Sequence, residues 1–70
     1  MSYVVKATGL EPVLVPTKKV GNALMKDWRE HKQAAGLEVR TVKGYGYMAR
    51  TAEDKARFRW VEAIVLREAA

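Results

Sequence analysis

The sequence has no cysteine, a single histidine, only two prolines and no apolar run long enough to cross a membrane. Without cysteine no disulfide can form, and one imidazole leaves too few ligands for a structural zinc site. The lack of a long apolar run argues against a membrane-spanning helix and against a membrane partner. The first residues also lack the charged-then-apolar pattern of a secretory signal, so we expect a cytoplasmic location.

What remains is a chain of 70 residues, of which 49% are hydrophobic and 30% charged. This composition is typical of one small globular domain spanning 1–70. A domain of this size buries only about 60% of the surface that its unfolded chain exposes. Because neither a disulfide nor zinc can strengthen so small a core, a second copy or a partner protein could complete it, and a homodimer is one expectation.

A hairpin is predicted at the start of the chain. Residues 3–7 and 13–15 are rich in strand-forming side chains. Gly9 and Pro12 lie between them and indicate a turn. Pro12 also favours an edge position, because proline cannot donate a hydrogen bond to a neighbouring strand.

A helix is predicted next, from about 18 to 35. Thr17 can cap its N-terminus, and Gly36 stands where a glycine usually ends a helix. On a helical wheel one stripe is apolar and is expected to face the core. That stripe consists of Val20, Leu24, Trp28, His31 and Ala35.

The second half is expected to hold another hairpin and a second helix. Residues 37–42 alternate in polarity as a strand does, and 47–50 resume extended character after a turn over 43–46. A helix from about 52 to 68 should follow, capped by Thr51. Its apolar residues cover most of the wheel, so it would pack on the sheet and also on a partner or a second copy. The residues assigned to this protein interface are Phe58, Val61, Val65 and Leu66.

The predicted fold is therefore α+β, with the element order β-β-α-β-β-α. Two helices would lie on one face of a small, mainly antiparallel sheet. The sequence leaves open whether that sheet has three strands or four.

The positive charge is concentrated in one segment. The chain has 13 Lys and Arg against 8 Asp and Glu, a formal charge of +5, and residues 17–50 carry the whole excess. Lys18 and Lys19 fall in the first turn of the predicted helix, where the helix dipole disfavours cations by roughly 0.3–1 kcal/mol each. Cations retained at that position, beside free backbone N–H groups, suit the binding of a phosphate.

Two tyrosines, Tyr45 and Tyr47, lie between Lys43 and Arg50. Basic residues interleaved with aromatic ones can neutralise phosphates and stack on bases. We therefore expect a small basic module that binds RNA or DNA through the first helix and the 39–50 hairpin, with an affinity that falls as salt rises. The residues predicted to contact the nucleic acid are Lys18, Lys19, Lys26, Arg29, Arg40, Lys43, Tyr45, Tyr47 and Arg50.

Residues 43–50 resemble the first ribonucleoprotein motif of RNA-recognition-motif domains, which begins with a basic residue, a glycine, an aromatic, a small residue and a second aromatic. The resemblance implies stacking roles for Tyr45 and Tyr47 and a phosphate role for Lys43, but Arg50 stands where an aromatic is expected. Residues 39–47 also resemble the wing hairpin of winged-helix response regulators. Each resemblance covers only about ten residues, so neither is a family assignment.

The alternative function is a non-enzymatic protein-interaction module, such as a small inhibitor or accessory factor that docks on a larger host protein. Its basic face would then meet an acidic protein surface. No catalytic residue, metal or cofactor is expected, because His31 stands alone among residues that could act in chemistry. Asp27 and Glu30 are explained more simply by pairing with neighbouring cations than by chelation.

Overall fold

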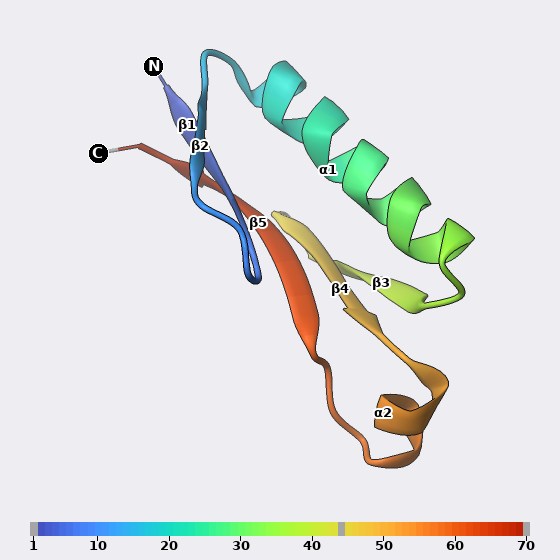
Figure 1. Cartoon of the computed structure of the whole chain (residues 1–70). Coiled ribbons are helices and arrows are strands. Elements are labelled where there is room, and N and C mark those ends of the chain that lie inside the picture. Colours follow the sequence, from blue (N-terminus) through green and yellow to red (C-terminus); the bar gives the residue numbers. More distant parts are fainter. Residues whose placement is uncertain (1, 44, 70) are drawn as a thin grey trace.

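The computed structural model describes residues 2–43 and 45–69, and its strands form one antiparallel sheet (Figure 1). Gly44, part of the predicted turn and of the ribonucleoprotein-like motif, lies outside the described residues. The spatial order of the strands is β2-β1-β5-β4-β3. The elements are β1 (Tyr3–Ala7), β2 (Val13–Val15), α1 (Lys18–Ala34), β3 (Glu38–Val42), β4 (Gly46–Arg50), α2 (Ala52–Ala56) and β5 (Glu62–Glu68). The described residues thus form a small α+β domain with five strands and two helices.

The first hairpin and the first helix agree with the sequence prediction. β1 and β2 pair antiparallel, and β2 lies at one edge of the sheet, as Pro12 indicated. The Oγ1 atom of Thr17 accepts a hydrogen bond from the backbone N–H of Val20 at 3.2 Å and so caps α1. At the other end Gly36 takes a φ of +87°, in the left-handed region that glycine adopts without a Cβ clash.

The prediction of a second helix over 52–68 is wrong beyond its first turns. Thr51 caps a helix as expected, but α2 ends at Ala56. The chain then turns at Phe58, which has a φ of +56°, and continues as β5. Arg59 N–H donates to the carbonyl of Asp54 at 3.1 Å, and Phe58 N–H donates to the carbonyl of Lys55 at 3.1 Å. These two bonds form a Schellman motif, a common C-terminal cap of helices, with phenylalanine at the position where glycine is preferred.

β5 is the central strand of the sheet, and this explains why its sequence was misinterpreted. It pairs with β1 on one side and with β4 on the other. Neighbouring strands on both edges partly cover the side chains of β5 on both faces, and Ala63 and Val65 are half-buried although they point away from α1. The run from Ala63 to Leu66 is therefore apolar throughout and does not alternate. Such a run cannot be separated from a buried helix by periodicity alone. The sheet consequently has five strands, not three or four.

α1 covers one face of the sheet, while α2 lies at the end of β4, away from α1 (Figure 1). The prediction that both helices pack on the same face is therefore wrong. The pairing register places Val5, Val15 and Leu66 on the face that α1 covers. Together with other buried residues they form the core: Val5, Ala7, Val15, Met25, Ile64 and Leu66.

The buried face of α1 is turned relative to the predicted stripe. Gly21 and Met25 are buried and Trp28 is half-buried, whereas Val20 and Leu24 remain 42% and 41% exposed. His31 and Ala35, which the stripe also included, are exposed. The cause is a close approach at Gly21, where a Cβ atom would lie 2.5 Å from Cδ1 of Leu66. A helix that contacts the sheet through glycine rotates the neighbouring larger residues outward.

Candidate nucleic-acid interface

The nine residues predicted to contact nucleic acid lie on two faces of the sheet. Side chains alternate between faces along a strand, and paired residues of neighbouring strands share a face. Tyr47 pairs with Ile64 and therefore points toward α1. Arg50 lies three residues after Tyr47 on the same strand, so it points to the opposite face, away from α1. Arg40 pairs with Met48, the neighbour of Tyr47, and therefore points away from α1 as well. The structure thus separates these two arginines from the lysines and arginine of the helix.

Four of the nine residues converge on one hollow between α1 and the β3–β4 hairpin, which we call the α1–hairpin pocket. It has a volume of about 390 Å³. Lys26 and Arg29 come from α1, and Tyr45 and Tyr47 come from the hairpin side. The other residues that line it are Asn22, Met25, Thr41, Val42 and Gly46.

The side chain of Arg29 bridges the helix and the hairpin. Its Nη1 atom donates a hydrogen bond to the hydroxyl of Tyr47 at 3.3 Å, and its guanidinium carbon lies 5.3 Å from the centre of the Tyr47 ring. Its Nε atom is buried and has no hydrogen-bond partner within residues 2–43 and 45–69. A buried donor without an acceptor is unfavourable, so Arg29 is held at a cost to stability. The second terminal nitrogen of its guanidinium, Nη2, is not used in the bond to Tyr47 and can donate to a further acceptor such as a phosphate oxygen.

A line of polar residues extends the pocket along α1. Lys19, Asn22, Lys26 and Arg29 are spaced three or four residues apart and therefore share one face of the helix. In the part of the chain that the structure describes, neither Lys19 nor Lys26 has a carboxylate within 4.0 Å. Tyr45 is 52% exposed at the mouth of the pocket, so its ring is accessible to a stacking partner.

Lys18 and Lys43 are exposed and stand outside the pocket lining. Lys18 begins α1, and Lys43 lies in the turn after β3. Tyr47 is half-buried and packs against the core. This position differs from the stacking role that the ribonucleoprotein-like motif implies, because that role needs an aromatic ring on an open sheet face.

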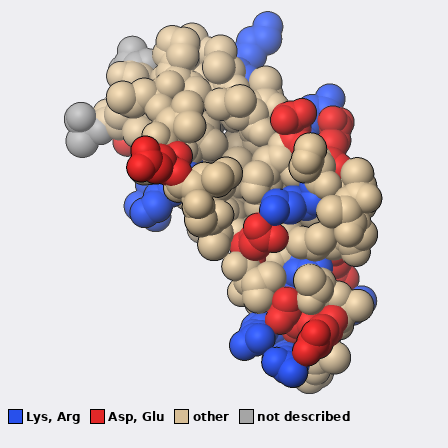
Figure 2. All heavy atoms as spheres, viewed as in Figure 1, with Lys and Arg blue, Asp and Glu red and all other residues tan. Residues whose placement is uncertain are grey.

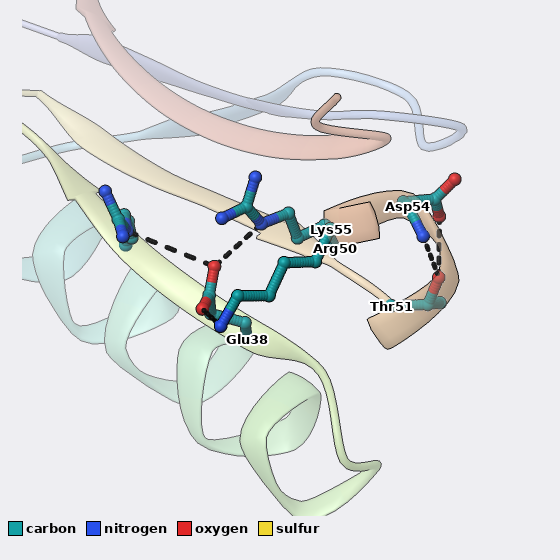
Figure 3. A network of polar contacts seen from close by, with 6 residues as sticks. Glu38, Arg50, Thr51, Asp54 and Lys55 are labelled. Carbon is teal, nitrogen blue, oxygen red and sulfur yellow. Dashed lines mark hydrogen bonds and ion pairs between the residues drawn. The ribbon is translucent and has the colours of Figure 1, made fainter. Parts of the chain in front are cut away.

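The face away from α1 holds a charge cluster centred on Glu38 (Figure 3). Oε2 of Glu38 accepts a hydrogen bond from Nε of Arg50 at 2.7 Å, and Oε1 lies 3.2 Å from Nζ of Lys55. Arg40 is the third cation, with its Nε 4.0 Å from Oε2. Hydrogen bonding to Arg50 is the largest influence on the Glu38 carboxyl and, with Lys55, lowers its pKa. The Arg50 guanidinium also lies 4.0 Å from the ring centre of Trp60. These contacts give the Arg50 side chain a role in the stability of the fold, in place of the predicted contact with a nucleic acid.

A second ordered carboxylate stabilises α2. The Oδ2 atom of Asp54 accepts a hydrogen bond from the hydroxyl of Thr51 at 2.8 Å, and Oδ1 accepts one from Nε of Arg59 at 3.1 Å. The bond from Thr51 is the main cause of a lowered pKa at Asp54. Figure 2 shows acidic and basic atoms mixed at this end of the molecule, where Arg57 also pairs with Glu53.

The predicted protein interface is dispersed, because the helix that was to carry it is absent. Leu66 is buried in the core beneath α1, and Val65 points to the opposite face of the sheet. Phe58 is 92% exposed in the connection between α2 and β5, and Val61 follows in the same connection. These four residues do not form one surface.

Sequence reasoning missed a second hollow, of about 490 Å³, between α1 and the β1–β2 hairpin. Leu24 and Trp28 line it from the helix, and Leu10 and Val13 line it from the hairpin. His31 and Asp27 also belong to its lining. The exposed half of the apolar stripe on α1 was the only available signal, and it was interpreted as core.

Within the described residues no group of three or more His, Cys, Asp or Glu side chains could hold a metal ion. No described helix is long and apolar enough to cross a membrane. No protein-family model matches the chain, and neither a curated protein nor a solved structure is significantly similar to it. The site must therefore be interpreted from its own geometry.

Proposed function

We propose that this protein binds nucleic acid and that the α1–hairpin pocket takes an unpaired base with its adjoining phosphates. The observation that supports this proposal most is the convergence of Lys26, Arg29, Tyr45 and Tyr47 on one hollow. These residues come from segments separated in the sequence by a whole strand. Proteins that bind single-stranded nucleic acids combine cations with accessible aromatic rings in the same way.

Each residue has a distinct part in the proposed complex. Tyr45, half exposed at the mouth, stacks on a base. Arg29, whose Nη1 atom is held by the Tyr47 hydroxyl, offers the donors of Nη2 to a phosphate. Lys19 and Lys26 continue the cationic line along α1 and contact the neighbouring phosphates. Arg40 and Arg50 are left out, since they face away from this site.

The pocket favours single strands over duplexes on physical grounds. A base in a duplex is paired and stacked between neighbours, so it cannot lie on Tyr45 without being extruded. Phosphate contacts alone would give affinity without preference between the two forms. The cytoplasmic location expected from the cysteine-free sequence stays a prediction.

Fluorescence anisotropy tests the proposal. Labelled single-stranded RNA, single-stranded DNA and duplex DNA are titrated with the protein at several salt concentrations. We expect micromolar or tighter binding of a single strand near physiological salt, and weaker binding of the duplex. Binding that appears only at low salt, with no preference among the three, would mean that the charge of +5 is a generic surface and would overturn the proposal.

A further inference from the structure

The sheet face that points away from α1 is apolar at its centre and has no helix over it except α2 at the β4 end, within residues 2–43 and 45–69. We call it the open face. Its residues follow from the pairing register: Val4 lies opposite Leu14, and Val65 lies opposite both Lys6 and Gly46. Six apolar side chains belong to it, namely Val4, Leu14, Val42, Met48, Ala63 and Val65.

These apolar residues form a continuous surface and not scattered single positions. Gly46 lies between Val65 and Val42 in the pairing, and Met48 lies opposite Ala63. Five of the six are half-buried by their neighbours, and Leu14 is 71% exposed. A contiguous apolar patch on a small protein marks a surface that binds a partner.

The charge on the open face is positive. Lys6 and Arg67 belong to it and have no carboxylate within 4.0 Å among the described residues. Arg40 belongs to it too. The strands contribute one carboxylate to this face, that of Glu38, which three cations already surround. Among the residues that the structure describes, the patch is therefore an apolar strip with unpaired cations beside it and no unpaired carboxylate on its strands.

This combination decides among the candidate occupants. A second copy placed face to face would bury Lys6 and Arg67 of both copies in one interface, and the strands offer no free carboxylate on this face to pair with them. Nucleic acid would need accessible aromatic rings to stack on, but β1 and β4 turn Tyr3 and Tyr47 toward α1. Trp60 is half-buried at the α2 end of this face, where the Arg50 guanidinium carbon lies 4.0 Å from its ring centre and already occupies a stacking position. A helix with an apolar stripe flanked by carboxylates would cover the apolar strip and would also pair with the cations beside it.

We propose that the open face docks an acidic amphipathic helix of a partner protein. The helix would lay its apolar stripe over Val4, Val65 and Met48, and its carboxylates would pair with Lys6 and Arg67. The sheet would then be covered on both faces, with α1 on one side and the partner helix on the other, which is a common layered arrangement. This proposal is independent of the α1–hairpin pocket, which lies on the other face.

The test uses two synthetic helical peptides of about 18 residues, long enough to form helices in water. Both carry the same leucine stripe, flanked by glutamate in one and by lysine in the other. We expect the acidic peptide to bind the full chain with micromolar affinity and the basic one to bind at least about tenfold more weakly. Amide shifts in NMR spectra should change in β1, β4 and β5 at positions of the open face.

A charge-reversal variant makes the test specific. In the double variant Lys6→Glu, Arg67→Glu the preference between the two peptides should invert. A charge-matched double variant on the opposite layer, Lys18→Glu, Lys19→Glu, should leave peptide binding unchanged. Circular dichroism should show that both variants fold, because the four substituted residues are exposed and have no ion-pair partner among the described residues.

The proposal would be overturned by equal binding of the two peptides, by no binding at millimolar peptide or by shifts confined to α1. A concentration-dependent dimer that forms through the open face would overturn it as well. An open face that bound only single-stranded oligonucleotide or only anionic phosphatidylglycerol vesicles would also overturn it. Failure of the peptide test with intact oligonucleotide binding would leave the proposed nucleic-acid function standing, and the reverse result would leave the docking surface standing.

Discussion

The Nε atom of Arg50 lies 2.7 Å from Oε2 of Glu38, across the pair of strands β4 and β3. Arg50 is only 9% exposed, so this carboxylate is the partner that keeps its guanidinium satisfied away from water. Lys55 joins the same carboxylate from α2 and thereby ties the short helix to the edge of the sheet. One acidic residue thus connects three elements.

Replacing Glu38 by glutamine should lower the free energy of unfolding at neutral pH, because the buried cation of Arg50 loses its counter-charge. Urea unfolding measures this change. Glu53→Gln is the matched control, since Glu53 pairs with Arg57 in an exposed i, i+4 contact and its loss should cost less than about 0.5 kcal/mol. Equal effects of the two substitutions would contradict a structural role for the Glu38 cluster.

Stability should fall in acid because of Glu38 and Asp54. Both carboxyls have a pKa below the ordinary values of 4.5 and 3.8, mainly through hydrogen bonds from Arg50 and Thr51 respectively. The unfolded chain therefore binds protons more readily, so this stabilisation is complete above the ordinary values and is lost as pH falls through the lowered ones. Urea unfolding from pH 7 to pH 2 should show a shallower decline for Glu38→Gln and Asp54→Asn than for the natural chain. An identical decline would contradict the assignment.

Gly46→Ala should destabilise the sheet by about 3 kcal/mol, because a Cβ at this position would overlap the backbone carbonyl of Ile64. Backbone atoms of a central strand cannot move aside as a flexible side chain can. Gly36→Ala is a useful comparison: it meets no atom within 4 Å and should lose only the about 1–2 kcal/mol of left-handed strain. Thermal unfolding ranks the two variants, and a milder effect at Gly46 would contradict the close approach of β4 to β5.

Phe58→Gly should stabilise the protein by about 0.5–1 kcal/mol, since it removes left-handed strain from a non-glycine residue. Little burial is lost with the side chain, which is 92% exposed. Phe58→Ala is the control, because it removes the ring and keeps the strain, and its stability should stay near that of the natural chain. Chemical unfolding distinguishes them, and a destabilised glycine variant would show that the ring has a packing role.

Lys26→Ala should weaken single-strand binding and reduce the slope of log affinity against log salt by about one. The reason is that one fewer phosphate is neutralised and one fewer counterion is released. Arg57→Ala, a cation in the connection after α2, serves as the control and should leave the slope unchanged. Anisotropy titrations at four salt concentrations measure both slopes. A loss of affinity at Lys26 with no change of slope would place this residue outside the phosphate contacts.

Local signals in the sequence determined the first half of the fold. The strands 3–7 and 13–15, the Thr17 cap and the Gly36 stop all appear where the sequence predicted them. Each depends on residues within a few positions of one another, so backbone sterics and capping hydrogen bonds suffice to specify it. The α+β class followed from these elements.

Tertiary structure alone decided the role of residues 62–68. An apolar run suits a buried helix and a central strand equally, and only the pairing partners of β5 choose between them. Those partners are β1, at the other end of the chain, and β4. The same pairing decides which face each side chain takes, and so it separates Arg40 and Arg50 from the pocket that Lys26, Arg29, Tyr45 and Tyr47 share. The composition of the basic segment was readable in the sequence, but its division between two faces depends on strand register, which only long-range contacts specify.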